Sequence, residues 1–275
     1  MIMQGRILVP TDLSPESNSV FPWACTIAQA FPNKLYLLNV MDPDSVNKPE
    51  RLEDFPQLTK FFAKDREANF NPPLQPEVPS SKLYLYHDDI ARVVLGVAKT
   101  NHADLICMAV IRPGANFAWW SAGKITESII EKAPCSVLCV RGRNLRQEQW
   151  ERPRLRNLLL LTELTPGGSV PLVKVMPWVQ RFNALLHVFP VGDLEKPVEQ
   201  ASLSNLHQQN GERANILMFK EPRQRTENLR KFIANTPVDL IIMTPRVRVR
   251  FSNRLFTDIF VKLLSTTDVP VLLLR

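Results

Sequence analysis

The second half of this chain repeats the first half in altered form, and the repeat limits what the chain can fold into. The segment DLICMAV at residues 104–110 corresponds to DLIIMTP at 239–245. Likewise, CSVLCVRG at 135–142 corresponds to VPVLLLR at the C-terminus. Two similar copies in sequence predict two similar structural units, each built on the same order of elements.

The length of the chain agrees with two domains. Each copy in the 275-residue chain is long enough to bury a hydrophobic core of its own. The stretch between the copies, RNLRQEQWERPR, is polar and charged and contains Pro153. Exposed linkers have this composition, so we predict domains at 1–142 and 156–275 joined by a linker at 143–155.

Short apolar runs alternate with amphipathic segments in both copies. Each run is too apolar to be half-exposed, which suits a strand buried on both faces. Strand–helix alternation of this kind predicts an α/β fold, with a doubly wound parallel five-stranded sheet in each domain. The expected strands are 6–10, 34–40, 82–86, 104–110, 136–141, 157–162, 184–189, 215–219, 239–243 and 270–274. The expected helices include 14–30, 58–69, 88–100, 168–180, 226–235 and 254–264. In the helix over 88–100, the spacing of Ile90, Val93, Val94 and Val97 predicts a stripe packed on the sheet.

Asp12 follows the first predicted strand and precedes a helix start. Ser14, Pro15 and Glu16 supply a capping hydroxyl, a proline for the first turn and an acid near the positive end of the helix dipole. Open α/β sheets bind ligands outside the carboxyl ends of their strands. Asp12 is therefore the first candidate for a binding residue.

Composition argues against several classes of protein. The four cysteines, Cys25, Cys107, Cys135 and Cys139, lie in apolar stretches and are expected to be buried hydrophobic residues. The four histidines form no ligand spacing with them, so no metal site is predicted. No apolar run is long enough to cross a bilayer and no signal peptide is evident, so we expect a cytoplasmic protein without a transmembrane segment.

With these residues in view, each half resembles the universal stress protein family, and the whole chain resembles its tandem two-domain members. The resemblance in the first half rests on ILVPTDLSPES at 7–17, LLNVMDP at 37–43, HADLICMAV at 102–110 and GKITESIIEKAPCSVLCVR at 123–141. In the second half it rests on LLLLTEL, VDLIIMT and VPVLLLR. The family's fold is the one that the alternation predicts.

The resemblance implies a site for ATP, ADP or AMP in the first domain. Asp12 stands at the family's strand-1 aspartate and Val40 at the valine after its second strand. The phosphate loop departs from the family's glycine motif: Ala109 occupies the first glycine position, only Gly123 keeps its place, and Lys124 replaces a hydroxyl residue. The loop still offers cations and flexible positions for a phosphate. The candidate nucleotide-binding residues are Asp12, Val40, Arg112, Gly114, Gly123 and Lys124.

The second domain departs further from the family pattern. Glu163 stands where the aspartate is expected, and Thr257 and Asp258 occupy the last glycine pair. A carboxylate at a helix start repels a triphosphate, so nucleotide binding is not expected in this domain.

The net charge of +7 is concentrated in the second half, which carries +6 over residues 156–275. Within it, PRVRVRFSNR at 245–254 places arginines at alternate positions. They form a candidate anion site, although pairing with acids such as Asp258 is the favoured explanation. Nucleic acid is disfavoured as a partner because no aromatic residues are interleaved to stack bases. The arginines are Arg246, Arg248, Arg250 and Arg254.

Three functions remain open at this point. The first is a stress-response or regulatory protein with little or no catalysis that binds an adenine nucleotide in domain 1. The second is a nucleotide-free scaffold for an unknown protein partner. The third is a weak ATP hydrolase, for which the sequence offers no obvious general base. The resemblance also implies an intrachain pseudo-dimer, in which the strands at 136–141 and 270–274 pair, and it allows a homodimer of the full chain.

Overall fold

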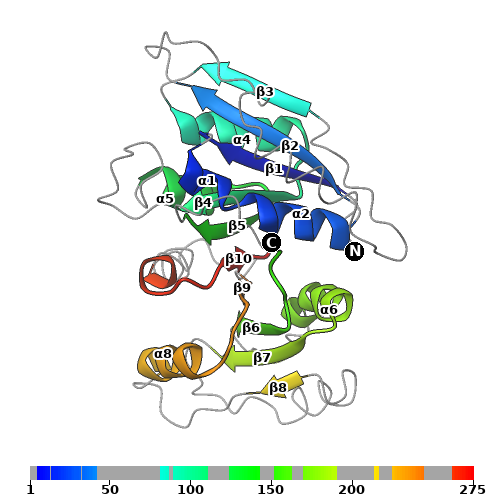
Figure 1. Cartoon of the computed structure of the whole chain (residues 1–275), viewed down its shortest axis with the longest axis vertical. Helices are drawn as coiled ribbons and strands as arrows, with labels where there is room; N and C mark the ends of the chain where they lie inside the picture. The colour runs from blue at the N-terminus through cyan, green and yellow to red at the C-terminus, as the bar shows by residue number, and fades with distance from the viewer. Residues whose placement is uncertain are drawn as a thin grey trace. The chain divides into compact units, whose positions relative to one another are not determined.

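The computed structural model describes residues 5–12, 14–31, 33–41, 81–86, 89–110, 124–142, 152–162, 170–190, 214–216, 225–244 and 262–275. The chain divides into two compact units, Ile2–Pro153 and Arg154–Arg275, called here the N-terminal and the C-terminal unit (Figure 1). Each is described by itself.

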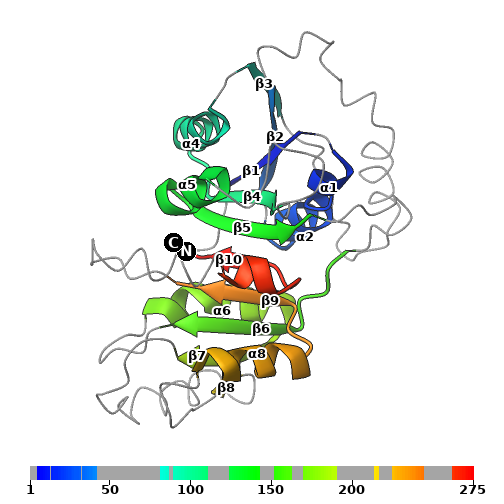
Figure 2. The ribbon, with the colours of Figure 1, turned by 90° about the vertical axis from the view of Figure 1, so that its left-hand side faces the viewer.

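The N-terminal unit is a parallel sheet with helices on both faces. Its described strands lie in the order β3-β2-β1-β4-β5, and every pairing is parallel. Helices α4 (Ile90–Thr100) and α5 (Lys124–Lys132) cover one face, and α1 (Pro15–Asn18) and α2 (Phe21–Ala30) cover the other (Figure 2). This is the predicted doubly wound topology. The strands are β1 (Arg6–Thr11), β2 (Lys34–Met41), β3 (Ser81–Tyr86), β4 (Leu105–Val110) and β5 (Ser136–Arg141).

The apolar runs form strands because both faces of the sheet are covered. All six residues of β4 are buried, which leaves no position where a polar side chain would reach water. Ile7, Val9, Ile106 and Met108 have no exposed surface. The core of this unit therefore lies on β1 and β4, the strands that continue directly into the candidate site.

The predicted helix over 14–30 is two helices. Helix α1 ends at Asn18, and α2 begins at Phe21 with Pro22 in its first turn. A proline lacks the N–H that a continuing helix requires, and its ring would meet the carbonyl of Asn18 four residues before it. The Ser19 hydroxyl instead donates to the Glu16 carbonyl oxygen over 2.7 Å, within the turn that separates the helices.

Helix α4 buries a slightly different face from the predicted one. Asp89 caps it, its Oδ1 accepting from the Arg92 N–H over 2.9 Å. The sequence predicted a stripe of Ile90, Val93, Val94 and Val97, but the buried residues are Ile90, Ala91, Val94 and Ala98. Because alanine lets a helix approach the sheet closely, packing favours the alanine side over the two remaining valines.

The C-terminal unit has the same topology. Its described strands lie in the order β10-β9-β6-β7-β8, so that β6 takes the place of β1 and β9 that of β4. Helices α6 (Val170–Phe182) and α8 (Arg225–Asn235) lie on opposite faces (Figure 1). Residues 262–266 are also helical. The strands are β6 (Asn157–Thr162), β7 (Leu185–Pro190), β8 (Ala214–Ile216), β9 (Leu240–Met243) and β10 (Val271–Leu273).

Helix α6 is continuous although Pro177 lies inside it. It buries Leu172, Val175, Trp178 and Val179, which hold it on the sheet despite the lost backbone hydrogen bond. Tertiary packing therefore outweighs the local preference of proline against a helix interior. The predicted helix over 58–69 lies outside the described residues.

Candidate functional site

The carboxyl ends of β1 and β4 flank a topological switch point in the N-terminal unit. The two strands are neighbours, and the helices that follow them cover opposite faces of the sheet (Figure 2). Doubly wound sheets bind ligands in the crevice that this arrangement opens. Residues that contribute to such a site must lie at this edge of the sheet.

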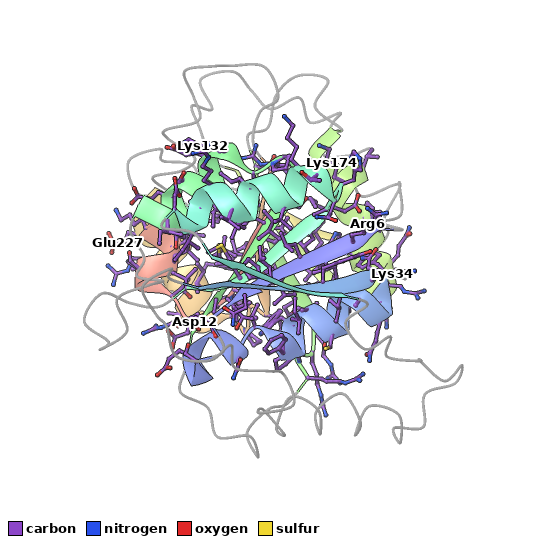
Figure 3. The ribbon with its side chains drawn as sticks, turned by 90° about the horizontal axis from the view of Figure 1, so that it is seen from above. Arg6, Asp12, Lys34, Lys132, Lys174 and Glu227 are labelled. Atoms are coloured by element: carbon purple, nitrogen blue, oxygen red, sulfur yellow. The ribbon has the colours of Figure 1, made fainter. Side chains whose placement is uncertain are left out.

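Asp12 lies at this edge, directly after β1 and at the opposite end of the strand from Arg6 (Figure 3). Its Oδ1 accepts the Ser14 N–H over 2.9 Å, which fixes the partly buried carboxylate. The Ser14 side chain caps α1 by accepting the Ser17 N–H over 3.2 Å. The Ser17 hydroxyl in turn is 2.9 Å from that of Thr11, so hydrogen bonds tie this turn to the end of the strand.

Val40 belongs to the same edge. It lies in β2 one residue past Asn39, which pairs with Thr11 at the end of β1. On its other side, Val40 pairs with Leu85 of β3. The fold thus places the backbone of Val40 beside the strand end from which Asp12 emerges.

Helix α5 brings two residues to this edge: Lys124, which is among the predicted candidates, and Thr126, which is not. Lys124 is its first residue. Because α5 connects two parallel strands, β4 and β5, its N-terminus faces the carboxyl edge of the sheet. Thr126, in the first turn, is only 2% exposed, and its hydroxyl has no hydrogen-bond partner within the described ranges.

The signal for Thr126 was present in GKITES at 123–128. The family pattern directs attention to the residue directly after Gly123, which is a lysine, and the hydroxyl appears two residues later. One helical turn brings both positions to the same helix end, where free backbone N–H groups favour an anion.

The remaining predicted site residues are not placed. Arg112, Gly114 and Gly123 lie outside the described residues, as does the arginine loop at 245–254. Of the candidates, the described structure therefore brings Asp12, Val40 and Lys124 to one edge of the sheet, and it adds Thr126 in the first turn of α5.

The corresponding edge of the C-terminal unit carries different chemistry. Thr162 ends β6, as Thr11 ends β1, and Thr244 follows β9 at the position of Ala109. The Thr244 hydroxyl donates to that of Thr162 over 3.3 Å, and both residues are buried. This bond joins the two strand ends that flank the switch point. In the N-terminal unit Thr11 has Ala109 in place of the second threonine, and the Ala109 methyl group cannot form such a bond.

The cysteines are buried, as predicted. All four are free thiols, and burial raises the pKa of Cys107 and Cys139 far above the ordinary value. The thiols of Cys107 and Cys139 are therefore protonated and unreactive at neutral pH. Among the described residues, no group of three or more His, Cys, Asp or Glu side chains is arranged to hold a metal ion. No helix in the described part of the chain is long and apolar enough to cross a membrane.

Comparisons with solved structures support this fold. A universal stress protein from Archaeoglobus fulgidus DSM 4304 is 13% identical, with a TM-score of 0.63 over 98% of this chain and 96% of that one. A protein of unknown function from Pseudomonas aeruginosa PAO1 is 15% identical, with a TM-score of 0.66 over 98% and 92%. The cytoplasmic domain of a prokaryotic cation chloride cotransporter is 12% identical, with a TM-score of 0.54 over 98% and 94%. At these identities the likeness concerns the fold alone.

Sequence comparison supplies the family. No curated protein sequence matches the chain. The model of the universal stress protein family matches residues 3–141, which is half of the chain and includes β1 to β5 of the N-terminal unit. The chain belongs to the universal stress protein family.

Proposed function

We propose that this protein is a regulatory, stress-response member of its family that binds one adenine nucleotide in the N-terminal unit and has little or no catalytic activity. The observation that carries the proposal is the buried Thr126 hydroxyl at the N-terminus of α5, which has no partner among the described residues. A buried hydroxyl without a hydrogen bond costs free energy. A phosphate oxygen bound at this helix end would accept its hydrogen bond.

Helix α5 suits an anion for two further reasons. Its first backbone N–H groups lack intrahelical acceptors, and its dipole is positive at this end. Lys124, its first residue, adds a cation to the same turn. The missing glycines of the family motif are thereby offset by a hydroxyl and a charge, which supports a phosphate site of altered geometry.

Asp12 supports recognition of the sugar or the base. Its carboxylate accepts hydrogen bonds and repels phosphates, so it suits the hydroxyl or amino groups of a nucleoside. The Ser14 N–H holds this carboxylate in one orientation. Val40 lies at the neighbouring strand end. We assign the nucleoside to the β1 and β2 side of the edge and the phosphates to α5.

The threonine pair supports the restriction of the proposed site to one unit. The bond between Thr244 and Thr162 joins the ends of β6 and β9 at the equivalent edge. In sequence, Glu163 replaces Asp12 and Asp258 lies at the place of a phosphate-binding hydroxyl. An acid there opposes phosphate binding, so we expect a single site per chain.

The first test is the identity and number of bound nucleotides. We expect mass spectrometry of ligand released from freshly purified protein to detect ATP, ADP or AMP, and calorimetry of the stripped protein to give one site per chain. Asp12→Ala should abolish binding. Glu163→Ala, at the equivalent position of the C-terminal unit, is the matched control and should leave it unchanged.

Two alternatives predict other results. Absence of bound nucleotide together with no calorimetric signal in the wild type would favour a nucleotide-free scaffold for a protein partner. Metal-dependent phosphate release that disappears in Asp12→Asn would indicate a weak ATP hydrolase, whereas equal release by that variant would reject one.

We place the protein in the cytoplasm and propose that its full chain forms a homodimer. We retain pairing of the strands at 136–141 and 270–274 as a prediction. Arg112, Gly114 and Gly123 are proposed as the loop part of the nucleotide site, and the arginines at 246, 248, 250 and 254 as a separate anion site that charge reversal would test.

A further inference from the structure

His187 is a buried titratable residue that the proposed function does not use. It lies in the middle of β7, between Leu159 of β6 and Asn215 of β8 in the sheet register. Its exposed fraction is 5%. Its ring packs edge-on against Phe232 of α8, with 5.3 Å between the ring centroids and 62° between the planes. The imidazole therefore lies in the interface between the sheet and α8.

This environment accepts the neutral ring better than the charged one. Neither Nδ1 nor Nε2 has a hydrogen-bond partner among the described residues. Buried polar atoms are nearly always paired, so two orphan nitrogens on one ring are unusual. A protonated ring has two N–H donors and a positive charge, and the described residues of the interface offer neither donor an acceptor.

The charged groups nearby do not change this conclusion. On α8, the described charged side chains, Glu227, Arg230 and Lys231, are all exposed, and Glu227 is already paired with Lys231 at 2.8 Å. Strands β6, β8 and β9, which complete the sheet around β7, carry no charged residue. No carboxylate on these elements is placed to compensate an imidazolium inside the interface.

We propose that His187 makes the C-terminal unit acid-responsive: when its ring takes up a proton, the packing of α8 on β7 loosens and this face of the sheet opens to water. The physical reason is that the charged ring must reach water, and Phe232 lies across the interface. Phe232 is partly exposed, and Leu229 is the only residue of α8 that is buried among those whose burial is described, so little apolar surface holds this helix on the sheet.

The direction of the pH dependence follows from burial. Desolvation lowers the pKa of His187 from its ordinary value of 6.5. A histidine with a lowered pKa in the closed state binds its proton more readily in the open state. The closed state is therefore fully favoured above pH 6.5 and loses stability as the pH falls through that value toward the lowered pKa.

The test is hydrogen exchange of the full chain at pH 7.5 and pH 5.5, corrected for the intrinsic effect of pH on exchange. We expect the protection of the α8 amides to fall several-fold at the lower pH, and that of the α4 amides in the N-terminal unit to stay the same. In His187→Leu, which cannot be protonated, α8 protection should no longer depend on pH. His102→Asn, which removes an exposed histidine, is the control and should behave like the wild type.

A second measurement covers the case in which His187→Leu does not fold. The imidazole signals of the wild type, followed by NMR, should show one histidine that titrates below 6.5 and whose titration coincides with the loss of α8 protection. The proposal is overturned if α8 protection does not change with pH in the wild type. It is equally overturned if His187→Leu folds and keeps the wild-type pH dependence.

Discussion

Thr126 gives the sharpest prediction at the scale of single residues. Thr126→Val keeps the shape of the side chain and removes a hydroxyl that has no partner among the described residues. Without ligand, we expect the variant to be more stable by about 1 kcal/mol, because a buried unsatisfied polar group is lost. With nucleotide, we expect weaker binding by about 1 kcal/mol, or roughly fivefold in Kd, because one phosphate hydrogen bond is missing.

Thermal denaturation and calorimetry on the same protein measure the two effects. Ser128→Ala, on the same helix, is a control for the loss of a hydroxyl. If Thr126→Val lowers stability and leaves affinity unchanged, then the hydroxyl has a structural partner and the phosphate site lies elsewhere.

We predict that the four buried cysteines do not react with alkylating reagents in the native protein. Because burial raises the pKa of Cys107 and Cys139, neither thiol forms a nucleophilic thiolate at pH 8. We expect iodoacetamide to modify no cysteine in the native protein within an hour and all four after unfolding in guanidinium. Mass spectrometry of the intact chain counts the additions. Rapid modification of the native protein would show that the core around these thiols opens readily.

Site residues differ in how far the sequence can reveal them. Asp12 was predictable because it follows an apolar strand and precedes a helix cap, and both signals are local. Thr126 was not predictable in this way, because the family motif places the hydroxyl directly after Gly123, and that position is Lys124. The threonine pair of the C-terminal unit joins residues 82 positions apart, and no local pattern indicates such a bond.

At the scale of elements, one carboxylate in each unit joins the starts of two strands. The Asp104 carboxylate, just before β4, accepts the N–H of Arg6 at the start of β1 over 2.9 Å. Asp239, just before β9, accepts the N–H groups of Arg156 and Asn157 over 2.7 and 2.8 Å. The aspartate of the repeated DLI segment therefore has the same role in both halves, because it ties the starts of the two central strands together.

The pairing of Asp104 with the start of β1 predicts non-additive mutations. A Cβ on Gly5 would overlap the Asp104 carboxylate, so Gly5→Ala must displace it. We expect Gly5→Ala and Asp104→Ala each to destabilise the N-terminal unit by about 2 kcal/mol, because each breaks a hydrogen bond to a charged group. The double variant should cost clearly less than the sum.

Hydrogen exchange of the β1 and β4 amides measures these losses, and Asp239→Ala is the matched control because it should lower protection only in β6 and β9. Additive losses in the double variant would mean that Gly5 and Asp104 act independently.

Elements were easier to predict than their breaks. The bounds of β5 and β6 are those that the apolar runs predict, because both strands are buried along nearly their whole length. The end of α1 before Phe21 is caused by Pro22, which lies in the first turn of α2. The apolar pattern continues across this point, so periodicity does not reveal that one helix ends and another begins. The prediction of the buried face of α4 was wrong for a similar reason. Periodicity shows only which residues share a face, and it does not show that the small side chain of Ala91 allows closer packing than that of Val93.

At the scale of the whole molecule, the two units share a topology and differ at the edge where a ligand would bind. Such a difference predicts that nucleotide stabilises one unit alone. A ligand at about one hundred times its Kd adds about 2.7 kcal/mol to the unit that binds it. We expect added ADP to raise the protection of amides in β1, β4 and α5, and to leave those in β6 and β9 unchanged.

Hydrogen exchange of the full chain with and without ADP resolves the two units in one experiment. Asp12→Ala should remove the effect, and Glu163→Ala should retain it. Equal protection of both units by ADP would contradict a single site. It would mean that the Thr162–Thr244 hydrogen bond does not prevent binding at the edge of β6 and β9. Protection of neither unit in the folded wild type would mean that no nucleotide binds at the edge of β1 and β4, and it would favour the scaffold function.

The two switch points differ in the groups that they offer to a ligand. Asp12 and Thr126 lie around the first, where the Thr126 hydroxyl has no partner among the described residues. Thr162 and Thr244 lie around the second and are hydrogen-bonded to each other. This difference is the physical basis for expecting only the N-terminal unit to respond.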